Sequence, residues 1–153
     1  MEPYQKLYNL FRREFELLKN YRSQYQCLLN PDERVSIITP TNKPVFMHNI
    51  FENYRNQAYP NKELIVILNN NQLNYQEWVD YSKNFPDTRV YQLDQSISLG
   101  ECLNFAVQQS TGDYIAKFDD DDYYGSNFLT DQLMCFLFTD AQFIGKTAHL
   151  ISI

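Results

Sequence analysis

From residue 35 onward, short apolar segments with strand character alternate with longer segments whose apolar residues recur every three to four positions. This alternation predicts strands connected by helices, because the two spacings are those of a pleated strand and of an α-helix. Right-handed crossovers then give an α/β fold, a mostly parallel sheet with helices on both faces. We expect strands at 35–40, 62–68, 88–93 and 114–118, helices at 45–57, 75–84, 99–110 and 127–138, and one or two closing strands within 141–153.

The N-terminal segment has a helical pattern of its own. Apolar residues recur at three- to four-residue spacing through residues 4–28, and Pro3 precedes them where its missing N–H is harmless. The apolar stripe, which includes Phe11, Phe15 and Leu18, is too wide for a solvated helix. We therefore expect it to pack on the domain or on a second subunit, which would make a homo-oligomer. The expected organisation is an amphipathic helix and linker at 1–34 and one domain at 35–153.

The charge and the glycines limit what this domain binds. The net charge is −6, with +1 on residues 1–34 and −7 on residues 35–153. A nucleic-acid partner is excluded, because phosphate neutralisation needs a basic patch. Only four glycines are present, so no glycine-rich phosphate loop can be written, and a bound diphosphate would need a metal to neutralise it. One of them, Gly112, follows the helix expected at 99–110 and is expected to cap its C-terminus.

The cysteines and the hydropathy bear on the compartment. Cys27, Cys102 and Cys135 are odd in number, far apart and without metal-ligand spacing, which favours buried free thiols in a reducing compartment. No stretch approaches the ~18 apolar residues of a membrane span, and the N-terminus has no apolar signal region. We expect a cytoplasmic protein without a membrane span, and leave open peripheral contact with a membrane.

Polar clusters follow three of the expected strands at their carboxyl ends. They comprise residues 39–42 after the first strand, 69–71 after the second and 119–122 after the fourth. Ligands of open α/β sheets bind beyond the carboxyl ends of the strands, where the strand order changes direction. If the first strand lies between the second and the fourth, in the order 3-2-1-4, all three clusters face one crevice.

The four consecutive aspartates, Asp119 to Asp122, are the sharpest chemical signal. Two carboxylates about 4 Å apart repel by roughly 4 kcal/mol at an effective dielectric of 20, so the run calls for a counter-charge. Oxygen ligands suit Mg²⁺, Mn²⁺ or Ca²⁺ and not zinc. Alternation along an extended segment would place Asp119 and Asp121 on one side.

Two other readings of the run stay open. It could be a solvated acidic turn that caps the next helix, or an EF-hand loop with Asp120, Asp122, Gly125 and Asp131 at positions 1, 3, 6 and 12. Tyr124 at position 5 and the preceding strand pattern count against the EF-hand. A nucleophilic triad is not supported, because His48 lies in an expected helix and His149 in an expected strand, where structural roles are more common.

Three stretches of sequence together resemble family 2 glycosyltransferases of the GT-A fold. They are VSIITPTNKP, NIFENYRNQAYPNKELIVILNN and SLGECLNFAVQQSTGDYIAKFDDDDYY, in that order, and the resemblance covers about residues 35–139. It implies a Rossmann-like nucleotide-diphospho-sugar transferase sandwich for the domain at 35–153. It also implies a nucleotide diphosphate sugar as donor, most simply a UDP-sugar, a saccharide or cell-envelope acceptor, and Mn²⁺ or Mg²⁺ as cofactor.

The resemblance also assigns roles to residues of the three clusters. It implies that Thr39, Pro40 and Thr41 line the nucleoside pocket, and that Asn69 or Asn70 stands where the family usually has an aspartate that contacts the base. Asp119 and Asp121 match the D-x-D pair, with Asp121 or Asp122 as the favoured metal ligand. Asn104 matches the polar end of an R-N pair near the diphosphate, and Leu103 stands in place of its arginine. The expected nucleotide contacts are Thr39, Pro40, Thr41, Asn69, Asn70, Asn104, Asp119 and Asp120, and the expected metal ligands are Asp119, Asp121 and Asp122.

The expected reaction is transfer of the sugar to an acceptor hydroxyl with inversion at the anomeric carbon. Family members usually continue with an acceptor-binding half that supplies a carboxylate base, whereas this sequence ends about thirty residues after the aspartates. No general base is assigned, and we expect donor binding with poor transfer. The alternatives are a truncated module that binds metal and nucleotide without catalysis, and a calcium-binding structural domain.

Overall fold

The computed structural model of the chain describes residues 3–145. These residues form two compact units, one running from Pro31 to Leu129 and the other combining the residues up to Asn30 with those from Thr130 onward. Each unit is described by itself below.

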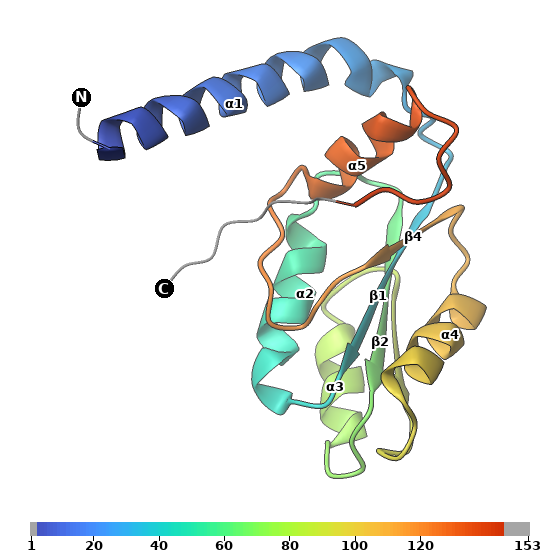
Figure 1. The fold of residues 1–153 in the computed structure, drawn as a ribbon. Coiled ribbons are helices and arrows are strands. Elements are labelled where there is room, and N and C mark those ends of the chain that lie inside the picture. Colours follow the sequence, from blue (N-terminus) through green and yellow to red (C-terminus); the bar gives the residue numbers. More distant parts are fainter. Residues whose placement is uncertain (1–2, 146–153) are drawn as a thin grey trace. The chain divides into compact units, whose positions relative to one another are not determined.

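The larger unit is built on a four-stranded parallel sheet (Figure 1). Its strands are β1 (Val35–Thr41), β2 (Lys62–Leu68), β3 (Thr88–Gln92) and β4 (Tyr114–Lys117), in the order β3-β2-β1-β4. The condition for one crevice, the order 3-2-1-4, is therefore met, and the expected parallel sheet is confirmed by three parallel pairings. β4 pairs with β1 only as far as Ile38, opposite Lys117. The last three residues of β1 thus extend past β4, and Pro40 interrupts no β1–β4 hydrogen bond.

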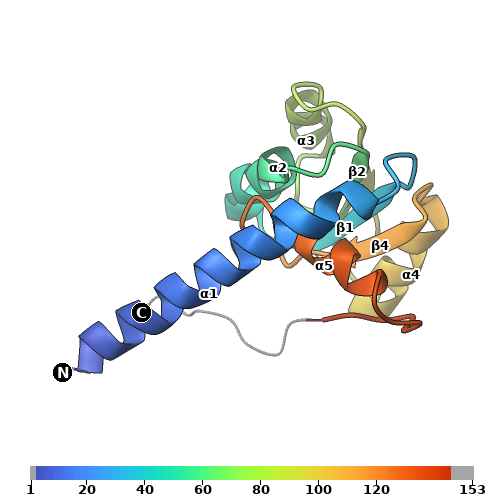
Figure 2. The same ribbon diagram turned by 90° about the horizontal axis from the view of Figure 1, so that it is seen from above.

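Helices cover both faces of this sheet, as expected (Figures 1 and 2). A single 3₁₀ turn, η2 (Pro44–Phe46), leads into α2 (Met47–Asn56), which lies beside α3 (Tyr75–Ser82), while α4 (Leu99–Gln109) covers the opposite face. On the α2–α3 side, the buried ring of Phe51 lies 4.9–6.3 Å from the rings of Trp78, Tyr81 and Phe85. On the other side, Cys102 and Ala106 of α4 pack against Ile38, Ile65 and Ile67.

Local sequence fixes where two of these helices begin. The Asn74 side chain accepts a hydrogen bond from the Glu77 backbone N–H at the start of α3. At the start of α4, Ser98 and Glu101 form a reciprocal capping box. Each cap satisfies backbone N–H groups that the first turn of a helix leaves unpaired.

Gly112 has a different role from the expected one. Ser110 caps α4 in an extended conformation, and among residues 3–145 no glycine has a positive φ, so the left-handed glycine cap is wrong. A Cβ at Gly112 would lie 2.7 Å from the Arg34 carbonyl oxygen and 2.7 Å from the Ser36 backbone nitrogen. Glycine is needed here because the turn before β4 approaches the backbone of β1 too closely for a side chain.

Buried Glu63 ties the amino ends of the strands together. Its side chain is 3% exposed, and one carboxylate oxygen accepts hydrogen bonds from the Ser36 hydroxyl (2.6 Å) and from the Thr111 backbone N–H (2.7 Å) and hydroxyl (3.0 Å). Arg89 of β3 donates to the other oxygen at 2.5 Å. Burial by itself would raise the pKa of Glu63, but the hydrogen bonds from Ser36, Thr111 and Arg89 outweigh it and lower the pKa.

The smaller unit contains α1 (Pro3–Tyr25), the turn η1 (Gln26–Leu28) and all but the first two residues of α5 (Phe128–Phe136). Arg22 of α1 donates two hydrogen bonds, of 2.6 and 2.9 Å, to the carboxylate of Asp131 in α5. The EF-hand alternative is thereby wrong, because the strand β4 stands where an EF-hand has its first helix, and Asp131 is paired with an arginine. The rings of Tyr21 and Tyr25 pack against Phe138, with centroids 5.9 and 5.0 Å away.

Three other expectations are corrected, stay untested or fall outside the described residues. Phe11 and Phe15 are 39% and 60% exposed, and the packing of the N-terminal stripe on the domain or on a second subunit stays a prediction. All three cysteines are free, but only Cys102 is buried. Residues 141–145 contain no strand, and residues 146–153, with His149, lie outside the described range. No helix among the described residues is long and apolar enough to cross a membrane.

Candidate functional site

The three polar clusters meet at the carboxyl end of β1. The Thr41 hydroxyl donates a 2.6 Å hydrogen bond to the carboxylate of Asp120, which joins the first cluster to the aspartate run. The Asn70 side chain donates to the carbonyl of Asn42 at 3.0 Å, and the Asn69 backbone N–H donates to the carbonyl of Thr41 at 2.8 Å. Segments 28 to 79 residues apart in sequence are thus hydrogen-bonded to one another at one edge of the sheet.

Three side-chain amides of α2 and its C-terminus hold the loop that carries the aspartates. Asn49, Asn53 and Gln57 are spaced four residues apart, so they lie on one face of the helix. Asn49 donates to the carbonyls of Asp120 (2.7 Å) and Asp122 (2.9 Å). Asn53 donates to the Asp122 carbonyl and accepts the Tyr124 backbone N–H. Gln57 donates to the carbonyls of Tyr124 and Gly125 and accepts the backbone N–H of Leu129, in the first turn of α5.

Tyr124 closes the loop back onto the end of β4. Its ring stacks on Phe118 with centroids 3.8 Å apart and planes 7° from parallel, and its hydroxyl oxygen accepts a hydrogen bond from the Asp119 backbone N–H at 2.9 Å. Burial, and then the nearby carboxylates of Asp119, Asp122 and Asp121, raise the pKa of Tyr124 to about 12, partly opposed by that hydrogen bond. The tyrosine therefore stays neutral and ties the loop to Phe118 and to the backbone at Asp119.

The four carboxylates of the aspartate run differ in their partners and in their exposure. Asp119 pairs with exposed Lys117, and Asp120 is half-buried against Thr41. The side chains of Asp121 and Asp122 are exposed and have no hydrogen-bond or ion-pair partner within residues 3–145. The chain bends at Asp120 and Asp121, so the alternation expected for an extended segment does not continue through the run.

These residues suit a hard divalent cation that the substrate also helps to bind. Among residues 3–145, no three His, Cys, Asp or Glu side chains converge as a preformed metal site. Mg²⁺-type ions usually take only one or two protein carboxylates together with substrate phosphates, and so need no such group. Asp121 and Asp122 supply exposed carboxylate oxygens, and the surface pair of Asp119 with Lys117 is weak enough to exchange. The donor set fits Mn²⁺ or Mg²⁺.

The side chains of the other expected nucleotide contacts form no hydrogen bond with the aspartate run among the described residues. Thr39 is 1% exposed, and its buried hydroxyl has no hydrogen-bond partner among the described residues. Pro40 is half-buried, and Asn69 donates its side-chain amide to the carbonyl of Asp94. Asn104 is exposed on α4 and has no hydrogen bond to the three clusters within residues 3–145. The structure brings Thr41, Asn70 and Asp120 into one network and leaves Asn104 outside it.

Comparison with known proteins identifies the family. The sequence model of Glycosyl transferase family 2 matches residues 36–148, which is most of the chain. The chain belongs to glycosyl transferase family 2. No curated protein sequence matches it. The matched region contains the sheet, the three amides of α2 and the aspartate run.

Solved glycosyltransferase structures share the fold. The crystal structure of S. aureus TarS 1-349 has 25% sequence identity and a TM-score of 0.58, and it aligns over 64% of this chain and 30% of that chain. A complex of the same protein with UDP-GlcNAc aligns equally well. The mannosyltransferase PcManGT from Pyrobaculum calidifontis, in complex with GDP-Man and Mn²⁺, has 21% identity and a TM-score of 0.56, over 77% of this chain and 39% of that chain. This family 2 chain thus spans about a third of the length of these proteins and has the GT-A fold.

Sequence reasoning missed several residues around the candidate site. The amides of α2 could have been noticed in the sequence, because Asn49, Asn53 and Gln57 are four residues apart and therefore share one helix face. A polar helix face is ordinarily exposed to solvent, however, so the spacing alone did not indicate a role in holding the loop. Lys43 was missed as well. Its backbone N–H donates to the Thr41 hydroxyl oxygen, and its exposed ammonium group lies 5.1 Å from the centre of the Phe46 ring. It brings a positive charge to the carboxyl end of β1.

Proposed function

We propose that this domain binds a nucleotide diphosphate sugar through a divalent metal and takes part in transfer of the sugar to an acceptor hydroxyl, with inversion at the anomeric carbon. One observation carries the proposal. The hydrogen bond between Thr41 and Asp120 holds the end of β1 against the aspartate loop and leaves the carboxylates of Asp121 and Asp122 exposed beside it. Acidic side chains at this edge of a parallel sheet, in a chain without a glycine-rich phosphate loop, favour a metal-bridged diphosphate over direct binding.

We propose Asp121 and Asp122 as the metal ligands, with Asp119 joining them when it releases Lys117. A bound Mn²⁺ or Mg²⁺ would supply Lewis-acid stabilisation of the charge that develops on the leaving diphosphate. The amides of α2 keep the loop backbone in place before substrate arrives, so little rearrangement is needed at the moment of reaction. Lys43 is a further candidate for a diphosphate contact, since it carries a positive charge at the same edge.

The nucleoside is proposed to lie over the end of β1, against Pro40 and Thr41 and beside the Asn69–Asn70 turn. The backbone at Thr39 and the side chains of Asp120 and Asn104 complete the proposed contacts. A UDP-sugar is the favoured donor, because the TarS structures to which this chain is similar include complexes with UDP and UDP-GlcNAc. The acceptor is proposed to be a saccharide or a cell-envelope component. Because exposed free thiols such as Cys27 and Cys135 persist in reducing compartments, we propose a cytoplasmic location.

Binding of UDP measured with Mn²⁺ and again with a chelator tests this proposal. Loss of a charge-assisted contact of about 1.5–3 kcal/mol predicts that Asp121→Ala weakens UDP binding in Mn²⁺ roughly 10- to 150-fold and changes little in chelator. Asp140→Ala removes the same charge from an exposed position of the smaller unit and is the control. Equal affinity of the parent protein for UDP with and without metal would contradict the proposal.

Sugar transfer is tested separately from binding. With a UDP-sugar and a panel of saccharide acceptors, product formation that depends on Mn²⁺ and on Asp121 would support catalysis by this chain. Metal-dependent UDP binding without any transfer would instead favour the alternative, a nucleotide- and metal-binding module that needs another segment or partner for catalysis.

A further inference from the structure

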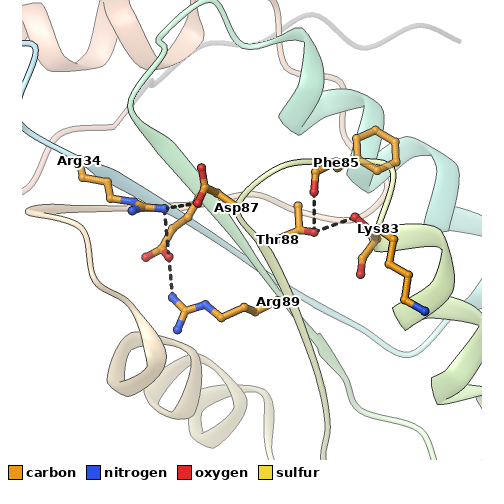
Figure 3. A pocket seen from close by; sticks show the side chains of 8 residues that line it. Arg34, Lys83, Phe85, Asp87, Thr88 and Arg89 are labelled. Carbon is orange, nitrogen blue, oxygen red and sulfur yellow. Dashed lines mark hydrogen bonds and ion pairs between the residues drawn. The ribbon is translucent and has the colours of Figure 1, made fainter.

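A cavity of about 270 Å³ lies at the amino ends of β1, β2 and β3, within the larger unit (Figure 3). It is at the opposite edge of the sheet from the aspartate run. Since β1 has seven residues at roughly 3.3 Å each, the two edges are roughly 20 Å apart. The cavity is lined by Arg34, Glu63, Ser82, Lys83, Phe85, Asp87, Thr88 and Arg89.

Two arginines in this cavity share one buried carboxylate. Arg89 donates to Glu63 at 2.5 Å, and Arg34 lies 3.7 Å from the same Glu63 oxygen. The other Glu63 oxygen is already occupied by Ser36 and Thr111. Glu63 therefore neutralises only one of the two guanidinium charges, and the inner part of the cavity carries an excess positive charge.

Arg34 is poorly satisfied as a hydrogen-bond donor. Its buried Nε has no partner among the described residues. A guanidinium group has five N–H donors arranged as a fork that fits carboxylates and phosphates. The side chain is 30% exposed, so the fork is reachable from solvent even though Nε is covered.

Asp87 supplies the remaining counter-charge from the rim of the cavity. Its carboxylate lies 3.2 Å from Arg34 and is 61% exposed, and Figure 3 shows it beside the Arg34 guanidinium. Asp87 has a φ of +51°, in the left-handed region that non-glycine residues seldom adopt. An exposed ion pair of this kind contributes only about 0–1 kcal/mol, so an incoming anion can displace it.

The remaining wall does not oppose an anion. The Thr88 hydroxyl lies 3.0 Å from the carbonyl oxygen of Ser82, the last residue of α3, and 3.1 Å from that of Phe85, so both carbonyls already have a hydrogen-bond donor. Lys83 points away from the arginines in Figure 3 and pairs with Asp80 outside. Phe85, which is 7% exposed, adds an apolar surface.

We propose that this cavity binds the phosphoryl group of a small molecule, with Arg34 and Arg89 as its ligands and Asp87 as the group it displaces. A carboxylate would only exchange one negative charge for another at Arg34. A phosphoryl group carries about −1.5 to −2 charges and three acceptor oxygens, so it can engage both guanidinium groups after Asp87 has moved. The site is independent of the proposed nucleotide site, since it shares no residue with it.

Titration of the whole chain with inorganic phosphate, followed at the Nε–Hε signals of Arg34 and Arg89 in ¹H–¹⁵N spectra, tests the proposal. Phosphate should shift both signals saturably, and acetate should shift them less at equal concentration. Phenyl phosphate distinguishes the two sources of the phosphoryl group. Tighter binding of the ester indicates a phosphorylated small molecule that uses the Phe85 surface, and equal binding indicates free phosphate.

Two substitutions with opposite expected signs keep the test decisive. Asp87→Asn should tighten phosphate binding roughly two- to fivefold by removing the competing carboxylate, and it should keep the fold because asparagine tolerates the left-handed backbone. Arg34→Gln should weaken binding by roughly tenfold or more. Asp140→Asn, a loss of the same charge in the smaller unit, should leave the affinity unchanged. The proposal is overturned if phosphate leaves the Arg34 signal in place, or if Asp87→Asn binds phosphate no more tightly than Asp140→Asn.

Discussion

Asn53 of α2 offers the most direct test of how the aspartate loop is held. Its side chain, 3% exposed, donates to the Asp122 carbonyl at 2.8 Å and accepts the Tyr124 backbone N–H at 3.0 Å. Asn53→Asp keeps the size and the acceptor oxygen but replaces the donor with a carboxylate oxygen. It therefore removes one hydrogen bond and places a buried negative charge against a carbonyl oxygen.

The expected destabilisation follows from the lost hydrogen bond and from the added buried charge. A hydrogen bond contributes about 0.5–1.5 kcal/mol, and a poorly compensated buried charge brings the total to about 2–3 kcal/mol. For a domain of this size that corresponds to a fall in Tm of about 4–12 °C. Binding of UDP in Mn²⁺ should weaken in parallel, because the loop backbone at Asp122 is no longer fixed.

The matched control is Asn56→Asp, which makes the same change at an exposed position three residues further along α2. It should cost about 0.3–1 kcal/mol, because a negative charge near a helix C-terminus is unfavourable. Thermal and urea unfolding of both variants measures the difference. Equal unfolding free energies for the two, within about 0.5 kcal/mol, would refute the assignment of Asn53 as a support of the loop.

The pH dependence supplies an independent check. Burial disfavours the charged form of the new carboxylate, so its pKa in the folded state should exceed the ordinary value of about 3.9. Once protonated, the group can donate to the Asp122 carbonyl. The loss of unfolding free energy in Asn53→Asp, relative to the parent protein, should therefore be complete above the folded-state pKa of the new carboxylate. It should shrink as the pH falls through that pKa.

Other substitutions test the rest of the structure. Gly112→Ala should cost about 1–3 kcal/mol because its Cβ meets backbone atoms at 2.7 Å, whereas Gly100→Ala, with no atom within 4 Å, should stabilise α4 by up to about 1 kcal/mol; comparable melting of the two would contradict this. The pKa of Glu63 is lowered, so its carboxylate stabilises the fold above its unfolded-state pKa of about 4.3 and loses that contribution as the pH falls through the lower folded-state pKa. Glu63→Gln should thus be destabilising at pH 7 and converge on the parent in acid unfolding experiments. Phe15→Ala should change the unfolding free energy of the monomer by less than about 0.5 kcal/mol, since the ring is 60% exposed; a concentration-dependent loss would support the homo-oligomer expected through this helix.

The sequence alone determined the elements and their order. β2, Lys62–Leu68, contains the apolar run 64–68 and ends where that run does, because a strand buried on both faces of a parallel sheet needs an uninterrupted apolar segment. The polar ends of β1 and β2 and the run Asp119–Asp122 also marked one edge of the sheet, since parallel strands place their carboxyl ends together. Local patterns suffice for these features because each depends on a single segment and its periodicity.

Tertiary structure decided which long-range partners these segments found. The amides of α2 resemble a solvated helix face until the loop about 70 residues later is placed against them. Gly112 was expected to serve its own helix, but it is required by the backbone of β1, 76 residues earlier. Arg34, Glu63 and Arg89 likewise form one cluster only because three strands start side by side. Such contacts depend on how strands and helices pack. The residues next to a side chain in the sequence therefore do not indicate which distant residue the fold will place against it.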